Sequence, residues 1–393
     1  MKHSWLFALI LTGLVLSCGK DKDDTTLPVP EPFTATMVVG GDVSMLQRYE
    51  DKNVAFYDDK GAKIDDVLNY LKSGSVGWNA LRVRLFVNPV EKTPDGQKDP
   101  QVCQDLDYVV RLGKRIKAAG FGFLLDFHYS DTWADPANQW IPAAWASLNN
   151  EQLNTEIYEY TRASLKRLVS EGAAPDFIQI GNEISYGMLW SASVDRNSKN
   201  NRCFTDSPQA NWDRFAGFLA QASKACREIC PNAKIIIHSE RSGNAGVLKD
   251  FCNRLSKVDY DIVGLSYYPF WHNSLSVLSN TLDMLASSFP DKKVQIVETA
   301  YYYQWQPKVG EGITYDFSST WAISPAGQAA FTADLIKELK KHANVNGLYW
   351  WFPEENGNGP DNSVLTGWVN RGLWDDNTHK AMPGLYVLKD FLN

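Results

Sequence analysis

The chain has 393 residues, of which 39 are Lys or Arg and 46 are Asp or Glu, giving a formal net charge of −7 at neutral pH. This mild acidity, without a basic cluster, argues against nucleic acid as a partner. Beyond its first residues the sequence contains no stretch that is apolar enough to cross a membrane.

Residues 1–17 are predicted to be an export signal. A basic start is followed by the apolar run WLFALILTGLVL, which is too short to span a bilayer comfortably. Cys18 follows the residues VLS, a pattern that resembles a bacterial lipoprotein box, in which this cysteine becomes the lipidated N-terminus. An uncleaved membrane anchor is the alternative, and it would hold the protein at the same membrane.

Residues 18–33 are predicted to be a flexible tether. They include GKDKDDTTLPVPEP, which is charged, contains proline and is poor in apolar residues. The acidic residues close to Cys18 resemble the surface-export signal of Bacteroidetes lipoproteins. We therefore expect an exported protein whose lipid anchor holds it in the outer membrane, at the cell surface of a Gram-negative bacterium.

Cysteine usage gives no sign of a zinc site, because no CxxC or Cys/His spacing is present. An odd number of cysteines follows Cys18, which leaves at least one unpaired in a monomer, the state that we expect. Cys226 and Cys230 lie four apart on a predicted helix, where they suit core packing better than bridging each other. The sequence leaves the pairing open among Cys103, Cys203, Cys226, Cys230 and Cys252.

Aromatic residues are abundant, with 14 Trp and 17 Tyr. In an exported protein such an excess usually provides faces on which sugar rings stack, and a large aromatic core is the alternative. The composition therefore favours a carbohydrate ligand.

After residue 34, short apolar runs alternate with longer stretches of helical periodicity. The predicted strands, which are apolar nearly throughout, cover residues 35–44, 80–87, 121–129, 176–183, 234–240, 262–269, 293–299 and 346–353. The clearest predicted helices cover residues 106–120, 155–172, 212–229, 326–343 and 384–392. Strands of this composition are typical of a parallel sheet that is covered on both faces.

Eight β/α repeats over about 360 residues predict a (β/α)8 TIM barrel, which forms a single catalytic domain over residues 34–393. A doubly wound sheet is the alternative, but no Gly-rich phosphate loop follows the first strand. In a TIM barrel the C-terminal ends of the strands converge on one face, and the active site is built there.

The predicted strand ends carry many polar and aromatic side chains, which should therefore point at one another. They are Asp42, Arg82, Arg84, Asp126, His128, Asn182, Glu183, His238, Glu240, Tyr267, Tyr268, Glu298, Trp350 and Trp351. For an isolated Asn-Glu after a strand, a solvated loop is the ordinary interpretation. The density of this set instead favours a reaction centre.

Two carboxylates stand out within this set. Glu183 closes the fourth predicted strand and Glu298 the seventh, roughly across the barrel. Glycosidic cleavage needs a carboxylate on either side of one bond, one to protonate the leaving oxygen and one to attack or to activate water. Carboxylates about 5 Å apart would make the second a nucleophile, with retention of the anomeric configuration.

Neighbouring residues could support this chemistry. The Asn182 amide could bind the sugar 2-hydroxyl, and Arg82 could keep Glu298 ionised, although a structural salt bridge is the alternative for Arg82. For Asp126 and Glu240 we expect a structural role rather than a catalytic one.

The sequence resembles glycoside hydrolase family 53, the endo-β-1,4-galactanases, within the clan of retaining TIM-barrel glycosidases. The resemblance is specific in FHYSDTWADP together with GNEI and GMLW, whereas Asn-Glu alone would not be. The matching stretches follow the expected order over nearly the whole barrel: 40–46, 81–89, 124–139, 178–190, 263–271 and 296–303.

This resemblance implies that Glu183 is the general acid/base and Glu298 the nucleophile. It implies substrate contacts from Arg82, His128, Trp133, Asn182, Tyr267 and Trp350, and Asp42, Asp131 and Tyr268 complete the set of substrate-binding residues that we expect. Some bacterial members carry calcium in a loop after the seventh strand. Residues 304–322 lack the acidic and amide ligands that the ion requires, and the oxygen-rich residues 354–362 are typical of turns, so we expect no cofactor; the sequence leaves calcium open but offers no clear ligand loop for it.

The expected activity is endo-cleavage of β-1,4-galactosidic bonds in galactan and in the type I arabinogalactan side chains of pectin. A non-catalytic lipoprotein that captures glycans is one alternative, but it does not explain carboxylates at both strand ends. The same barrel acting on β-mannan, xylan or glucan is another, which only the family-specific stretches disfavour.

Overall fold

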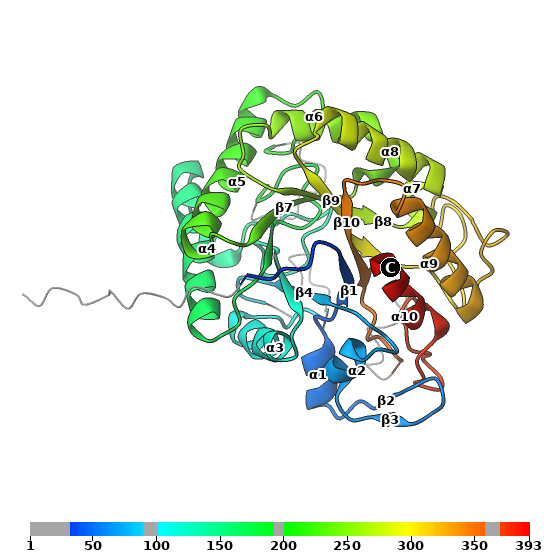
Figure 1. Cartoon of the computed structure of the whole chain (residues 1–393). Coiled ribbons are helices and arrows are strands. Elements are labelled where there is room, and N and C mark those ends of the chain that lie inside the picture. The colour runs from blue at the N-terminus through cyan, green and yellow to red at the C-terminus, as the bar shows by residue number, and fades with distance from the viewer. Residues whose placement is uncertain (1–31, 90–98, 100, 192–199, 358–369) are drawn as a thin grey trace, which may run out of the picture.

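The computed structural model closes eight parallel strands into a barrel, as predicted (Figure 1). Each strand pairs with the next along the chain, and the first also pairs with the last. The barrel strands are β1 (Val38–Asp42), β4 (Ala80–Leu85), β5 (Gly122–Phe127), β6 (Phe177–Ile180), β7 (Lys234–Ser239), β8 (Ile262–Tyr267), β9 (Lys293–Thr299) and β10 (Val345–Trp351).

The structure describes residues 32–89, 99, 101–191, 200–357 and 370–393. The predicted signal at residues 1–17, Cys18 and most of the tether at residues 18–33 lie outside the described residues, as does part of 354–362. Within the described ranges, no helix combines the length and the apolar character that crossing a membrane demands.

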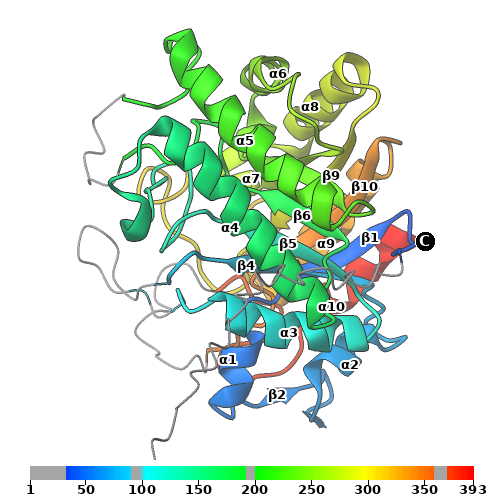
Figure 2. The ribbon, with the colours of Figure 1, turned by 90° about the vertical axis from the view of Figure 1, so that its left-hand side faces the viewer.

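Helices surround the barrel on its outside (Figures 1 and 2). They are α3 (Leu106–Ala118), α4 (Asn150–Ser170), α5 (Gln209–Ile229), α6 (Ala245–Arg254), α7 (Pro269–His272), α8 (Leu275–Ser288), α9 (Pro325–Leu339) and α10 (Pro383–Val387). Helix α4 begins five residues before its predicted start, because Asn149 and Gln152 form a capping box there.

Between β1 and β4 the chain forms α1 (Leu46–Asp51), a hairpin of β2 (Phe56–Tyr57) and β3 (Lys63–Ile64), and α2 (Val67–Lys72). The hairpin was not predicted, because strands of two residues are too short to show a period of two. Short 3-10 helices are η1 (Ala143–Trp145), η2 (Arg241–Gly243) and η3 (Leu388–Leu392).

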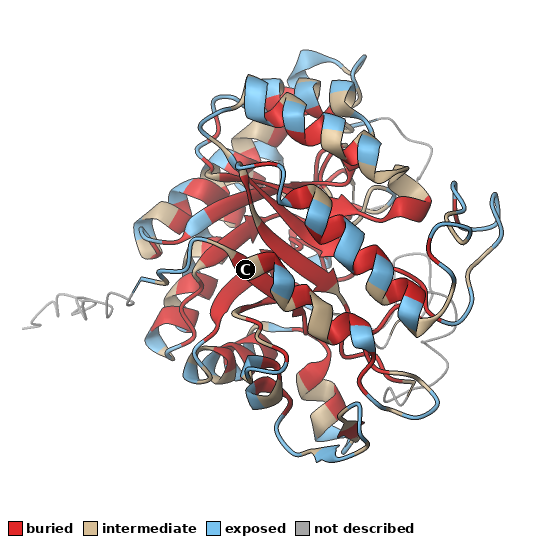
Figure 3. Cartoon of the chain, turned by 45° about the vertical axis from the view of Figure 1, so that its right-hand side comes forward, coloured by how far each residue is buried: buried red, intermediate tan, exposed pale blue. Residues whose placement is uncertain are grey.

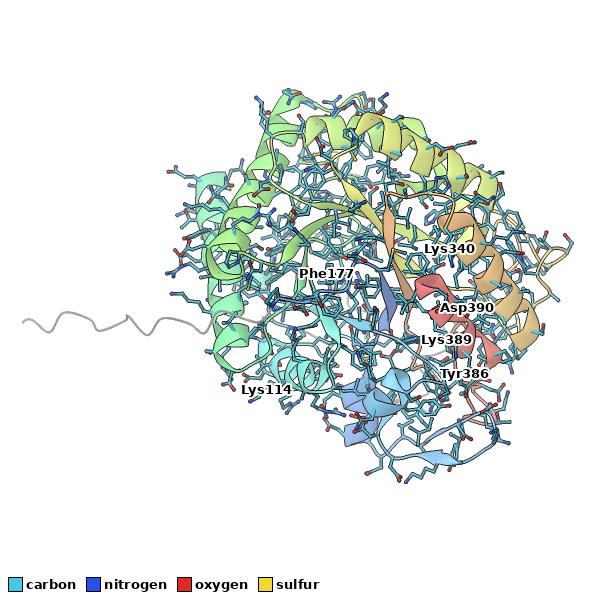
Figure 4. All side chains as sticks on the ribbon, in the orientation of Figure 1. Lys114, Phe177, Lys340, Tyr386, Lys389 and Asp390 are labelled. Carbon is cyan, nitrogen blue, oxygen red and sulfur yellow. The ribbon has the colours of Figure 1, made fainter. Side chains whose placement is uncertain are left out.

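The C-terminal segment joins the last repeat to the first. The hydroxyl groups of Tyr386 and Tyr70 lie 2.6 Å apart, and Lys389 Nζ donates to the Ser75 carbonyl at 2.8 Å. From α9, Lys340 Nζ donates to the Asp390 carbonyl at 3.2 Å; Figure 4 labels both residues beside Lys389 and Tyr386. Ring closure therefore involves side chains as well as the β1–β10 pairing.

The core has two layers, because strand side chains alternate between the barrel interior and the helices. Figure 3 shows the barrel strands almost entirely buried and the helices exposed mainly on their outer faces. Inside the barrel, each strand contributes one residue to a separate apolar cluster, against which Phe33 packs: Val38, Ala80, Leu124, Phe177, Ile236, Ile262, Val297 and Tyr349. Phe177 is labelled in Figure 4. The five described cysteines are all free.

Beyond this cluster, the inward positions become polar towards the C-terminal strand ends. On β4 the inward residues are Ala80, then Arg82; on β7 they are Ile236, then His238. All of them are buried. The barrel interior is thus an apolar base with a polar layer on top.

Candidate active site

A cavity of about 630 Å³ opens at the C-terminal ends of the strands. It contains both carboxylates that were predicted to react. Its wall is formed by Asp42, Arg82, Arg84, Asp99, Gln101, His128, Thr132, Trp133, Ala134, Asp135, Pro136, Ala137, Asn138, Trp140, Asn182, Glu183, Glu240, Tyr268, Trp271, His272, Glu298, Trp351 and Arg371.

Arg82 of β4 is the hub of the cavity floor. Its guanidinium lies 2.7 Å from Asp42 Oδ2, 2.7 Å from Asp126 Oδ2 and 3.0 Å from Glu298 Oε1, and it donates to Asn182 Oδ1 at 2.8 Å. Burial alone would lower the pKa of Arg82, but the three carboxylates raise it above its ordinary value. Arg82 therefore stays charged while only 1% exposed.

Glu183 lies on the bend that follows β6. Gly181 has φ +107° and Glu183 has φ +46°, a region that residues other than glycine rarely adopt. A regular continuation of the strand would send Asn182 and Glu183 to opposite faces, whereas here both line the cavity. Backbone strain of this kind persists only where the surrounding structure enforces it.

Two side chains hold Glu183 in place. Its backbone N–H donates to His238 Nδ1 at 3.2 Å, and Ser266 Oγ donates to its Oε1 at 2.6 Å. His238 Nε2 lies 2.9 Å from Ser266 Oγ, which closes the chain of contacts. Burial, followed by the charge of Arg82, lowers the pKa of His238 well below its ordinary value, so this imidazole is neutral.

Glu298 reaches the cavity through a β-bulge. Between Ile296 and Thr299, β9 has one more residue than either neighbouring strand. Val297 packs in the interior cluster, so strict alternation along the strand would turn the next side chain, Glu298, towards the helices. Because of the bulge, Glu298 points into the cavity instead. Its Oε1 contacts Arg82, and Tyr268 Oη donates to its Oε2 at 3.0 Å.

The two carboxyl groups are close. Ser266 Oγ lies 2.6 Å from Glu183 Oε1 and 3.4 Å from Glu298 Oε2. The separation of those two oxygens therefore cannot exceed the sum of the two distances. One serine hydroxyl thus lies close to both carboxyl groups, which places them within reach of the same bound sugar.

Their surroundings differ in charge. Burial raises the pKa of Glu183 well above its ordinary value, and the charges of Glu298 and Glu240 raise it further. Burial also raises the pKa of Glu298, but Arg82 acts in the opposite direction. The proton that the pair shares therefore resides on Glu183.

Most of the predicted site residues line the cavity. Besides the two carboxylates these are Asp42, Arg82, His128, Trp133, Asn182 and Tyr268. His128 Nε2 lies 3.1 Å from Asp126 Oδ2, and its Nδ1 accepts from the Ala134 N–H at 3.0 Å. The Arg84 guanidinium lies 4.4 Å from the centre of the Trp133 ring, and Trp133 Nε1 donates to Asp99 Oδ2.

Three predicted substrate-binding residues lie outside the cavity wall. Asp131 accepts hydrogen bonds from the N–H groups of Asn88 (3.0 Å) and Ala143 (2.8 Å), so it connects loops. Tyr267 and Trp350 occupy outward positions of β8 and β10, where each is fully buried. Their polar atoms donate to the carbonyls of Asn273 and Arg371. Side-chain alternation instead places the next residues, Tyr268 and Trp351, at the cavity.

The prediction missed several wall residues because they come from loops or from the four-residue helix α7, among them Trp140, Trp271, His272 and Arg371. Trp271 lies in the family-like stretch 263–271, which was a usable signal. No pattern marks Arg371, which lies 5.0–5.7 Å from five aromatic rings: those of Tyr268, Phe270, Trp271, Tyr302 and Trp351. Among the described residues, no three His, Cys, Asp or Glu side chains form a group that could hold a metal ion.

Comparison with known proteins identifies the family. The model of "Glycosyl hydrolase family 53" matches residues 38–388. The chain belongs to glycosyl hydrolase family 53. It is 31% identical to an endo-beta-1,4-galactanase of Bacillus subtilis, over 93% of this chain and 82% of that protein. It is 34% identical to an arabinogalactan endo-beta-1,4-galactanase of Thermothelomyces thermophilus, over 70% of this chain and 78% of that protein.

Solved structures agree with this family 53 assignment. The family 53 catalytic domain of Ignisphaera aggregans has a TM-score of 0.76 and 32% identity, covering 92% of this chain and 97% of that one. A fungal beta-1,4-galactanase structure has a TM-score of 0.72 and 29% identity, covering 90% and 99%. A family 10 endo-beta-1,4-xylanase, at 13% identity and a TM-score of 0.56, shares the fold.

Replacing Arg82 by Met should destabilise the protein, because three buried carboxylates would lose their common counter-charge. We expect a loss of about 3–5 kcal/mol in the free energy of unfolding. Without Arg82 the folded-state pKa values of Asp126 and Glu298 should rise. A raised folded-state pKa contributes stability at low pH that is lost as the pH increases, so the deficit should be larger at pH 8 than at pH 5.

Denaturant unfolding at the two pH values measures this deficit. Arg167→Met is the control, since Arg167 pairs with Asp107 and Glu171 at the exposed surface, where ion pairs contribute little. An Arg82→Met protein as stable as the wild type at pH 8 would contradict the hub role.

Proposed function

We propose that the protein is an endo-β-1,4-galactanase that hydrolyses galactan and the type I arabinogalactan side chains of pectin by a retaining mechanism. The observation that carries the proposal is the carboxyl pair: Glu183, whose pKa burial raises, faces Glu298, which Arg82 and Tyr268 hold. The galactanases among the relatives support the choice of substrate.

In the first step, Glu298 attacks the anomeric carbon of the sugar in the cavity. The bond to the glycosidic oxygen breaks, its electron pair leaves with that oxygen, and the oxygen takes the proton of Glu183. The products are a glycosyl ester on Glu298 and a shortened chain with a free hydroxyl group. The closeness of the two carboxyl groups, both contacting Ser266, supports direct attack over a water-mediated one.

In the second step, Glu183 acts as a general base, whereas it acted as a general acid in the first. Ester formation removes the negative charge of Glu298, which had helped to raise the pKa of Glu183, so Glu183 stays ionised. It accepts a proton from a water molecule whose oxygen attacks the anomeric carbon. The ester bond breaks, Glu298 recovers its charge, and Glu183 is protonated again.

The other wall residues position the sugar. Asn182 Oδ1 accepts from Arg82, and its Nδ2 donates to the Ala134 carbonyl at 2.8 Å, which leaves its second amide hydrogen for a sugar hydroxyl. Trp133, fixed by Asp99 and Arg84, offers an indole on which the apolar face of a galactose ring can stack. His128, Tyr268 and Asp42 complete the proposed binding surface.

A glycan-capture protein would need the aromatic and polar wall but not the carboxyl pair, so the pair favours an enzyme. The same barrel acting on another β-1,4-glycan is tested by assaying the purified protein on galactan, mannan, xylan and glucan. Galactan should be hydrolysed fastest; preference for another polymer would overturn the substrate assignment.

We further propose that the enzyme is exported and anchored by a lipid on Cys18 at the outer surface of its cell, as residues 1–33 suggest. Replacing Cys18 by Ser should release the protein from the membrane fraction. The measurement is the distribution of the protein between membrane and soluble fractions of the producing cells, and unchanged membrane association would contradict the lipid anchor.

Replacing Glu183 or Glu298 by Gln should abolish most galactan hydrolysis while leaving the fold intact, because proton transfer alone accounts for about a 10²–10⁴-fold effect. On substrates with good leaving groups, Glu183→Gln should partly recover and Glu298→Gln should not. Rates of both variants on both substrates decide this, with Glu151→Gln on the exposed first turn of α4 as control. Near wild-type rates would show that the assignment is wrong.

The dependence of kcat/KM on pH should be bell-shaped. The acid limb should report ionisation of Glu298 and the alkaline limb loss of the Glu183 proton, since burial and nearby charges raise the pKa of Glu183 well above its ordinary value. The measurement is kcat/KM on galactan across pH for the wild type and Glu183→Gln. The variant should lose the alkaline limb; an unchanged limb would assign the proton to another group.

A further inference from the structure

Glu240 is a cavity residue that the reaction described above does not use. It follows β7, is 7% exposed, and lines the same cavity as Glu183 and Glu298. A buried structural carboxylate was the expected role. Such a role requires partners inside the protein, so the partners of Glu240 decide whether that expectation holds.

Neither oxygen of Glu240 completes a hydrogen bond with a described residue. Arg241 Nε lies 2.9 Å from its Oε1, an ion pair without the alignment of a hydrogen bond. Burial raises the pKa of Glu240, while the charge of Arg241 and the Ser185 hydroxyl act in the opposite direction; that hydroxyl is also hydrogen-bonded to Ser239 Oγ at 2.7 Å. Glu240 is thus a buried carboxylate whose accepting capacity is largely unused.

The other carboxylates of the cavity wall are already hydrogen-bonded. Asp42 accepts from Ser44 and Arg82, and Glu298 accepts from Tyr268. Asp135 accepts from the Ala137 N–H at 2.7 Å and from Asn138 Nδ2 at 2.8 Å. Asp99 accepts from Trp133, and Glu183 from Ser266. Among the described wall residues, Glu240 alone is a carboxylate without such a bond.

The segment that carries Glu240 is held rigidly. The Arg241 N–H donates to Ser239 Oγ at 3.0 Å, and Ser242 Oγ donates to the Ser266 carbonyl at 2.6 Å. At Gly243 a Cβ atom would lie 2.6 Å from the His272 carbonyl, so η2 packs directly against α7. A free acceptor on a fixed backbone is a preorganised binding group.

Strand order places Glu240 on the acid/base side of the cavity, because it follows β7, which pairs with β6, the strand that leads to Glu183, whereas Glu298 lies on β9. The charge of Glu240 raises the pKa of Glu183, whereas Arg82, Asp126 and Asp42 are the charged groups that act most strongly on Glu298. Since the general acid protonates the oxygen that departs, the sugar beside it on this side belongs to the leaving group.

We propose that Glu240 binds the sugar on the leaving-group side of the cleaved bond, where its carboxylate accepts hydrogen bonds from hydroxyl groups of that sugar. The inference rests on the proposed function. Hydrogen bonds to a charged, desolvated acceptor are among the stronger ones, so the contact favours a carbohydrate leaving group over one without hydroxyl donors. Glu240 is then a specificity-determining residue, and Arg241 fixes it from behind.

The test compares two substrates with the same sugars on the glycosyl side. One is galactan, and the other is a nitrophenyl β-1,4-galactobioside, whose aryl leaving group carries no hydroxyl. Replacing Glu240 by Ala should lower kcat/KM on galactan about 10–100-fold and on the aryl substrate less than about 3-fold. Glu240→Gln, which keeps the size and one acceptor oxygen, should lie between.

Glu151→Ala, on the exposed first turn of α4, is the matched control, because it removes a carboxylate that does not line the cavity. It should keep the wild-type ratio of the two kcat/KM values, and thermal unfolding should show each variant folded. Equal losses of Glu240→Ala on both substrates, or the same change of ratio in Glu151→Ala, would overturn the proposal. A wild type that cleaves a different β-1,4-glycan would instead refute the proposed substrate, and the comparison would be repeated with that glycan.

Discussion

The structure of the barrel mouth depends on the ion pairs of Arg82. One guanidinium contacts Asp42, Asp126 and Glu298, which come from three different strands. The three carboxylates outnumber it, and Arg84, 3.4 Å from Asp42, supplies the second positive charge. Because desolvated charges must be balanced locally, a further ionised carboxylate beside this cluster is unfavourable. Glu183 bonds to Ser266 rather than to either arginine, so it is the group that keeps its proton.

The polar layer can exist because the barrel beneath it is closed by apolar side chains. One residue from each strand forms the interior cluster, and the next inward positions carry the arginine, carboxylate and imidazole groups. Every second residue of a strand points into the barrel, so the inward residues of neighbouring parallel strands form one layer, and no loop is needed to bring these groups together. The reacting residues are thus mounted on rigid strand ends, where small displacements cost the most in catalysis.

The strands, the main helices and the presence of both carboxylates at the cavity could be predicted from the sequence because each has a strong local signal. The polar ends of the predicted strands identified Arg82, Asn182 and Glu183, all of which line the cavity. Strand periodicity could not decide between Tyr267 and Tyr268, or between Trp350 and Trp351, because adjacent residues of a strand face opposite sides and the inward register depends on pairing. Arg371 comes from a loop and Trp271 from the four-residue helix α7, and neither segment is long enough to show a period from which an orientation follows.

Glu183 and Glu298 stand where the regular geometry of the barrel is broken. An extra residue in β9 turns Glu298 inward after Val297 is already inside, and positive φ angles at Gly181 and Glu183 turn the end of β6. An unbroken barrel would bring at most alternate residues of each strand to the cavity. The two irregularities bring one more from each: in β9 the packing residue Val297 and the cavity residue Glu298 become neighbours in sequence, and after β6 Asn182 and Glu183 both reach the cavity. A non-glycine residue with positive φ costs on the order of 1–3 kcal/mol in backbone strain. The hydrogen-bonded strands of the closed barrel hold the chain in these conformations despite that strain.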